Sequence, residues 1–274
     1  MTAIDTARNP LRTAGSLGLG VVMLWLSLVV FLPLAAVVAT GFDRGVSGFL
    51  GALGVPATLA ALGLSAGLAL VVSVVNAVIG TGVAWVLVRD DFAGRGILDR
   101  IVDVPFALPT IVTGVVMLAL YGAGSPIGVN LVGTRAGLLV SLLFVTLPFT
   151  VRTVQPVLRS LQVDIEEAAT TLGASRVATF RRIVLPSILP AILSGSALSF
   201  ARAIGEYGSL VLISSNLPFT TQIASALIYG KLQDSLDPVR STQEAAAIAT
   251  VLLVVCAIVL VAVEALRRRA ARRG

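Results

Sequence analysis

The sequence contains no histidine and a single cysteine, Cys256, and these shortages exclude several kinds of chemistry. One cysteine cannot form a disulfide within the chain. Without histidine there is no imidazole base, and a lone thiol cannot make a zinc site. The chain also lacks a G-x-x-x-x-G-K-[ST] loop for nucleotide phosphates. We therefore expect no catalytic, cofactor-binding or metal-binding residue in this chain.

Charged residues are also scarce, at 12% of 274 positions, whereas hydrophobic residues make up 57%. The mean hydropathy is +0.99. Soluble domains are about a quarter charged, so this chain has too few polar groups to cover a folded surface in water. The net charge of +6 comes from basic residues that gather in loops and at the C-terminus, which is typical of membrane orientation. We expect a lipid-embedded protein that binds no nucleic acid.

Six segments are apolar and long enough to cross the bilayer, whose hydrocarbon core of roughly 30 Å takes about 20 helical residues. They are Leu17–Thr40, Thr58–Val88, Val104–Tyr121, Ala136–Gln155, Ser187–Ser214 and Ala245–Leu266. The sequence therefore predicts an all-α membrane protein with six transmembrane helices. The membrane domain occupies 17–266, between an N-terminal tail at 1–16 and a basic tail at 267–274.

The first and fifth segments have special features. The first follows two arginines, as a signal peptide does, but its apolar run is too long and lacks a small-x-small exit, so we expect a retained anchor. The fifth is overlong and carries Gly205 and Gly208 near its end. It predicts a helix, a break and a shorter second helical piece.

The basic residues indicate the orientation. Of the twenty Lys and Arg residues, fifteen fall on one face of this topology, four fall on the other, and Arg202 lies inside a span. The larger set comprises Arg8, Arg12, Arg89, Arg95, Arg100, Arg152, Arg159, Arg176, Arg181, Arg182, Arg267, Arg268, Arg269, Arg272 and Arg273. By the positive-inside rule this face, with both termini, is cytoplasmic.

The cytoplasmic connection at 163–186 has the pattern of a folded element. Asp164 can cap a helix, and Glu167 three residues later completes a capping box. Gly173 provides a residue that can end this helix in the left-handed conformation. Ser175 can cap a second helix, which we expect to stop before Pro186. The first helix presents three apolar residues to a partner: Ala168, Ala169 and Leu172.

This connection matches, at every position, the EAA signature of the permease subunits of ABC importers. The matching residues are Glu167, Ala168, Ala169, Gly173, Ile183, Leu185 and Pro186. The resemblance implies a type I (MetI-like) transmembrane domain in a bacterial plasma membrane. It also implies that these residues, with Leu172, form a coupling helix that docks on a cytoplasmic ATPase subunit. ATP and Mg²⁺ would then be bound by that partner, and this chain would be no enzyme by itself.

Three further stretches resemble the oxyanion permeases of this class: Pro105–Gly114, Phe200–Ser209 and Ile213–Phe219. With the chain length and span number, they resemble the sulfate/thiosulfate type. The related molybdate and tungstate permeases have a similar Arg-Ala-x-Gly-Glu-x-Gly segment and remain an alternative. The resemblance implies a second, CysW-like permease subunit, with a homodimer as the less favoured possibility, and an extracytoplasmic sulfate-binding protein. A short helix within Thr221–Leu232 is a candidate landing surface for that protein.

Arg202 and Glu206 are charged residues at membrane depth, where such groups are costly and usually have a partner or face a cavity. Their i, i+4 spacing places them on one helix face, so each can neutralise the other. We favour a structural ion pair over a position beside the anion pathway. Two other classes of protein are less favoured. A secondary transporter would show matching broken spans in two halves, and a membrane enzyme would need a larger ionisable cluster.

Overall fold

The computed structural model describes residues 10–161 and 163–271, with side chains at 18–161 and 165–270. These residues form helices and connecting turns, with no β-strand among them. The elements are α1 (Pro10–Leu26), η1 (Ser27–Phe31), α2 (Leu32–Phe42), α3 (Gly45–Leu53), α4 (Pro56–Arg89), α5 (Arg95–Val102), α6 (Val104–Ala107), α7 (Thr110–Tyr121), α8 (Arg135–Ser160), α9 (Val163–Thr171), α10 (Arg176–Thr179), η2 (Phe180–Val184), α11 (Leu185–Ile204), α12 (Ala224–Leu232) and α13 (Pro238–Ala271).

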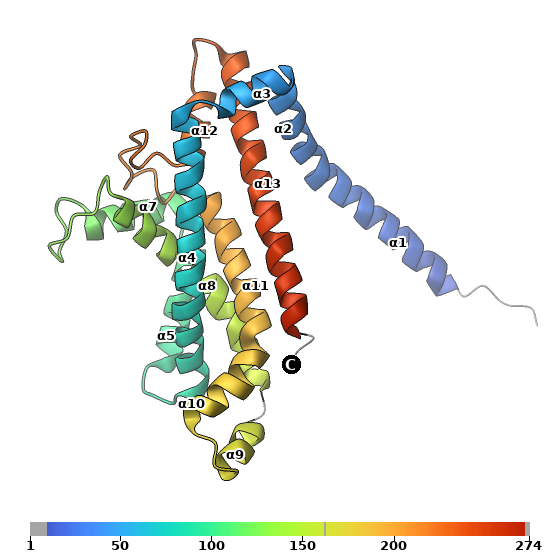
Figure 1. Cartoon of the computed structure of the whole chain (residues 1–274), viewed down its shortest axis with the longest axis vertical. Helices are drawn as coiled ribbons and strands as arrows, with labels where there is room; N and C mark the ends of the chain where they lie inside the picture. The colour runs from blue at the N-terminus through green and yellow to red at the C-terminus, as the bar shows by residue number, and fades with distance from the viewer. Residues whose placement is uncertain (1–9, 162, 272–274) are drawn as a thin grey trace, which may run out of the picture.

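Four long helices, α4, α8, α11 and α13, form an upright bundle (Figure 1). Helices α3 and α12 lie at one end, which we call the α12 end, and α5, α9 and α10 lie toward the other, the α9 end. Helices α1 and α2 tilt away from the bundle at one side, and α7 projects with its loops at the opposite side. The chain therefore has one packed centre and two protruding parts.

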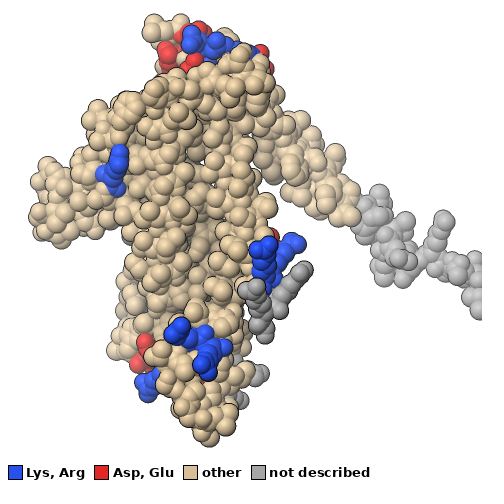
Figure 2. Space-filling view, in the orientation of Figure 1, with Lys and Arg blue, Asp and Glu red and all other residues tan. Residues whose placement is uncertain are grey.

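The outer surface is apolar over most of its height. Five helical segments are long and apolar enough to cross a membrane: Gly18–Phe42, Pro56–Arg89, Arg135–Ser160, Arg176–Ile204 and Pro238–Ala270. Figure 2 shows charged side chains at the two ends of the bundle and, between them, an uncharged belt with isolated basic patches. Exposure of such an apolar belt to water is unfavourable, so this surface is covered by lipid or by another apolar chain. The expectation of an all-α, multi-pass membrane protein is confirmed.

The prediction of six full spans is not met in the described residues, because the third predicted span is broken. Its residues form α6 and α7, of 4 and 12 residues, separated at Leu108 and Pro109. Leu108 has an extended conformation (φ −82°, ψ 131°), which a residue before proline favours. A helix of 12 residues reaches only about 18 Å, too short to cross the hydrocarbon core alone.

The fifth predicted span is only partly as expected. Helix α11 ends at Ile204 and the chain breaks at Gly205, so the predicted break is confirmed. The residues after it, Gly208 to Ile213, form turns rather than a second helix, so that part of the prediction was wrong. At the N-terminus, α1 begins at Pro10, inside the segment assigned to a tail, while residues 1–9 lie outside the described part.

The packed centre contains one very close contact between three helices. Thr150 on α8 is fully buried between Gly80 on α4 and Gly195 on α11. A Cβ atom at Gly195 would lie 2.8 Å from the Cα of Thr150, and one at Gly80 would lie 2.8 Å from its Cβ. The Thr150 hydroxyl also lies 3.2 Å from the Ser199 hydroxyl. Membrane helices approach this closely where small residues meet, and the contact fixes α4, α8 and α11 to one another.

Candidate coupling loop and membrane ion pair

Helix α9 ends as the sequence predicts but begins differently. It begins at Val163, so Asp164 is a residue of the helix and not its N-cap, and the predicted capping box was wrong. At the other end, Gly173 is left-handed with φ +88°. The Gly173 N–H donates to Thr170 O (2.9 Å) and the Ala174 N–H donates to Ala169 O (3.0 Å). These are the two hydrogen bonds of a Schellman motif, which makes the turn after α9 stiff.

The helix that follows the turn is longer than predicted. Ser175 caps it, as expected, because its side chain accepts a hydrogen bond from the Ala178 N–H (3.3 Å). The helix does not stop before Pro186, however, and runs without interruption from Arg176 to Ile204. A proline lacks one N–H donor and its ring crowds the preceding turn. The wider π-helical turn η2 ends at Val184, two residues before Pro186, within the stretch that the proline ring would crowd.

The structure separates the eight predicted coupling residues into two groups. Glu167, Ala168, Leu172 and Gly173 are exposed at the tip of the loop, where Ala169 is half-buried. The side chain of Leu172 is 88% exposed, so it is open to contact with a partner. The remaining three, Ile183, Leu185 and Pro186, are half-buried at the base of the long helix. The tip is therefore the part that a partner can reach.

Sequence reasoning missed the residues that hold this loop against the bundle. Arg89, the last residue of α4, forms an ion pair with Glu166 on α9. The Arg89 guanidinium lies 5.7 Å from the ring centre of Trp85, and Trp85 meets Phe180 edge to face at 5.4 Å. Between α9, α10 and η2 lies a hollow of about 490 Å³ whose walls include Trp85, Glu166, Glu167 and Phe180. No local pattern could have paired Arg89 with a residue 77 positions away.

A second polar cluster fastens α5 to α8 near the same end. Arg152 on α8 donates to Asp103 through Nε and Nη2 and to Asp99 through Nη1, each at 2.6 Å. Gln155 donates to Asp99 at 3.0 Å. The Gln155 hydrogen bond, followed by the Arg152 contacts, lowers the pKa of the Asp99 carboxyl. The cluster fixes the point from which the chain enters the broken helix α6–α7.

The charged pair at membrane depth is present at the break after α11. Arg202 and Glu206 form an ion pair in which Glu206 is buried and the Arg202 side chain is 32% exposed. Glu206 Oε1 also accepts the Ser209 N–H (2.8 Å), and the backbone carbonyl of Glu206 accepts the Ser225 hydroxyl (2.7 Å). The carboxylate therefore closes the turns after the break, and the neighbouring carbonyl ties them to α12.

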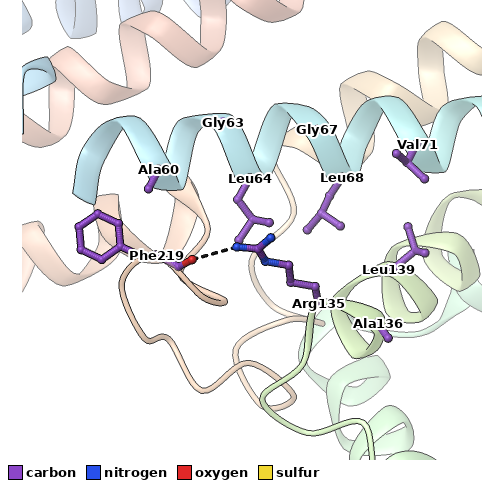
Figure 3. Close-up of a pocket in the computed structure, with 10 residues that line it drawn as sticks. All are labelled: Ala60, Gly63, Leu64, Gly67, Leu68, Val71, Arg135, Ala136, Leu139 and Phe219. Atoms are coloured by element: carbon purple, nitrogen blue, oxygen red, sulfur yellow. Dashed lines mark hydrogen bonds between the residues drawn. The ribbon is translucent and has the colours of Figure 1, made fainter. Parts of the chain in front are cut away.

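At the α12 end, Arg135 holds the loop between α11 and α12. Its Nε donates to Thr220 O (3.0 Å) and its Nη2 donates to Phe219 O (2.9 Å), and Figure 3 shows the second of these bonds. Phe219 has φ +63°, a conformation that bulky residues rarely adopt. Beside them a hollow of about 570 Å³ runs along α4 past Gly63 and Gly67 (Figure 3). The predicted helix within Thr221–Leu232 is confirmed as α12.

Comparison with known proteins identifies the class of this molecule. Residues 76–272 match the family of binding-protein-dependent transport system inner membrane components. The matched region includes α8, the coupling loop, α11 and the ion pair. The chain belongs to this family. It is thus a permease, a transport component, and the expectation drawn from the EAA signature is confirmed at the level of the family.

Curated relatives resemble the permease over nearly its whole length. A protein of Synechocystis named sulfate transport system permease protein CysT is 41% identical over 255 residues, which cover 90% of this chain and 87% of the relative. A CysT protein of Salmonella typhimurium is 37% identical over 265 residues, which cover 94% of each chain. Similarity at this level extends beyond the coupling loop to the spans and the outer loops.

Solved structures confirm the fold. A bacterial ABC transporter for import of the polysaccharide alginate aligns with a TM-score of 0.75 at 17% identity, covering 96% of each chain. The methionine transporter MetNI in an inward-facing form aligns with a TM-score of 0.60 at 18% identity, covering 77% of the permease and 94% of that chain. The permease therefore has the transmembrane fold of ABC importers.

Proposed function

We propose that the permease forms half of the channel of an ATP-driven importer for sulfate and thiosulfate. The observation that carries this proposal is the similarity to proteins named sulfate transport permeases, at 37–41% identity over 90% or more of the chain. The oxyanion-type segments around Pro109 and Arg202 lie within the matched length. Molybdate and tungstate transport is the alternative that the experiment below separates.

The loop at 163–186 is the proposed coupling element. Its exposed tip, with Leu172 at the apex, docks on a cytoplasmic ATPase subunit that binds ATP and Mg²⁺. The Schellman turn at Gly173 suits this task, because a stiff element transmits the closure of the ATPase subunits whereas a flexible loop would absorb it. On this proposal the α9 end is cytoplasmic, as are both termini.

The other proposed partners lie beside the permease and above it. A second permease subunit, of the CysW type rather than a second copy, completes the channel. An extracytoplasmic sulfate-binding protein delivers the anion at the α12 end. One structural neighbour, the alginate transporter, was solved in complex with a substrate-bound periplasmic protein, which supports a docking site of this kind.

The ion pair Arg202–Glu206 has a structural role in this proposal. Glu206 neutralises the charge of Arg202 and closes the turns after α11, so the segment offers a passing anion little net positive charge. A free arginine at this depth would bind sulfate strongly and slow its release. The pairing is therefore suited to a channel that must let the anion go.

The decisive test measures uptake of radiolabelled sulfate by cells that lack this gene, with and without the intact chain restored. Unlabelled thiosulfate and molybdate, each in excess, serve as competitors. We expect restored uptake that thiosulfate blocks and molybdate does not. Uptake of labelled molybdate in place of sulfate would contradict the proposed substrate and support the alternative. Failure to restore uptake of either anion, with the chain present in the membrane, would overturn both.

A further inference from the structure

The coupling helix is attached to the bundle in two different ways. At its C-terminus, α9 is continuous with the long helix Arg176–Ile204 through the turn at Gly173. Along its length, the described side chains at 165–171 make one hydrogen-bonded contact outside α9, the ion pair of Glu166 with Arg89. That pair is therefore the contact that determines how α9 lies against α4.

Glu166 and Glu167 are neighbours in sequence but differ in surroundings. Successive helical residues point about 100° apart, so the two carboxylates leave α9 in different directions. Glu166 turns toward α4, where its side chain is 22% exposed and that of Arg89 is 15% exposed. Glu167 is exposed at the tip. Glu167 thus borders the hollow beside α10 and is open to a partner, whereas Glu166 is engaged with the permease itself.

The surroundings of Arg89 make its contact with Glu166 stiffer than a surface ion pair. The guanidinium lies over the Trp85 ring, and Trp85 packs edge to face on Phe180 of η2. Trp85 and Arg89 of α4 therefore contact the chain on both sides of the Gly173 turn, at Phe180 and at Glu166. Removing one charge from a half-buried pair leaves the other without a partner, which costs more than loss of an exposed pair.

We propose that Arg89 and Glu166 are positioning residues that make α4 follow the movement of the coupling helix. This inference rests on the proposed function, because it assumes that the ATPase subunit moves α9. Helix α4 packs along α8 and α11 and meets both at the Gly80–Thr150–Gly195 contact. Movement of α9 therefore reaches the bundle centre through α4 as well as through the long helix. Without the pair, α9 still docks on its partner but slides over α4.

The test uses the complete transporter, reconstituted in liposomes with its ATPase, second permease and binding protein. The quantity measured is ATP hydrolysed per sulfate imported. We expect Glu166→Gln and Arg89→Gln each to raise this ratio several-fold with little change in ATP hydrolysis. The exchange of charges, Arg89→Glu with Glu166→Arg, should bring the ratio back toward the wild-type value. Glu264→Gln, which removes the two exposed ion pairs with Arg267 and Arg268 at the end of α13, is the control and should leave the ratio unchanged.

An unchanged ratio in both single variants would overturn the proposal, as would an assembled exchange variant that stays uncoupled. A second measurement does not depend on the substrate. With Cys256 replaced by alanine, spin labels at Ile165 of α9 and at Val78 of α4, both exposed residues, report the distance between the two helices. In the wild-type background we expect the same narrow distribution with and without ATP, whereas Glu166→Gln should broaden and shift it on ATP addition. If the wild-type and Glu166→Gln complexes give these distance distributions but the wild type imports no sulfate, only the substrate proposal is contradicted.

Discussion

At the scale of single residues, packing in the bundle centre depends on the absence of a side chain at two positions. Gly80 and Gly195 bring α4 and α11 against Thr150 of α8, where added atoms would meet backbone or a buried Cβ. The other glycines of α4 face open space. A Cβ atom at Gly82 on α4, for example, would meet no atom within 4 Å beyond its own helix. A side chain added at position 80 is therefore unfavourable, whereas one added at position 82 has room.

Gly195→Ala should therefore destabilise the permease. The new Cβ would lie 2.8 Å from the Thr150 Cα, a backbone atom that cannot rotate away, so α8 and α11 must separate. Overpacking of this kind costs about 1–3 kcal/mol. Thermal unfolding of the purified protein in detergent should show a lower midpoint for Gly195→Ala, while Gly82→Ala should unfold like the wild type. Equal midpoints for the two variants would argue against the three-helix contact.

The residue pairs of the site differed in how far the sequence could predict them. Arg202 and Glu206 are four positions apart on one helix, and the ion pair followed from helix geometry. The pair Arg89–Glu166 joins two elements, so it depends on how the chain folds back on itself. Local pattern finds contacts within an element, and contacts between elements need the fold.

At the scale of elements, the coupling loop is stiff because a helix, a Schellman turn and a capped helix follow one another within a few residues. Its left-handed glycine was predictable, since only glycine adopts that conformation without strain. The helix starts and stops were less so. Asp164 has the pattern of a cap but lies within α9, and Pro186 has the pattern of a stop but lies within a continuous helix. For Pro186, packing of the long helix in the bundle outweighs the local residue preference.

Gly173→Ala should weaken coupling without removing the chain from the membrane. A Cβ at φ +88° costs roughly 1–2 kcal/mol, so the turn relaxes to another conformation and α9 changes its direction. We expect binding-protein-stimulated ATP hydrolysis by the assembled complex to fall, with a normal amount of permease in membrane fractions. Gly96→Ala in α5, near the same end and with open space at its Cβ, is the matched control. A similar loss in both variants would point to a general effect at this end.

At the scale of the whole molecule, the positions of the membrane spans followed from a simple count of apolar residues, with one exception. Five of the six predicted spans are long helices in the structure. The third is short because prolines interrupt it, and hydropathy alone does not register a proline break. The orientation of the bundle across the membrane follows from the basic residues and stays a prediction.

Labelling of single cysteines tests that orientation. In a background with Cys256→Ala, Leu172→Cys at the α9 end and Leu236→Cys near the α12 end introduce thiols where the side chains are 88% and 95% exposed. In intact cells or spheroplasts that produce the permease without its ATPase subunit, a membrane-impermeant maleimide should react at 236 and spare 172, and after lysis it should react at both. Reaction at 172 from outside would show the opposite orientation and contradict the proposed coupling role of the loop.

The uninterrupted helix from Arg176 to Ile204 acts as a lever. Its 29 residues span about 43 Å, so a tilt of roughly 10° about Gly195 displaces the Arg176 end by about 5 Å and the Ile204 end by about 2 Å. The longer arm leads from Gly195 to the coupling turn, and the shorter arm leads to Arg202 and the break at Gly205. A displacement of one end of the helix reaches the other end through the helix itself, without rearrangement of side chains along the way. The displacement of the break after Ile204 depends on where the helix pivots, and the tight contact at Gly195 marks that point.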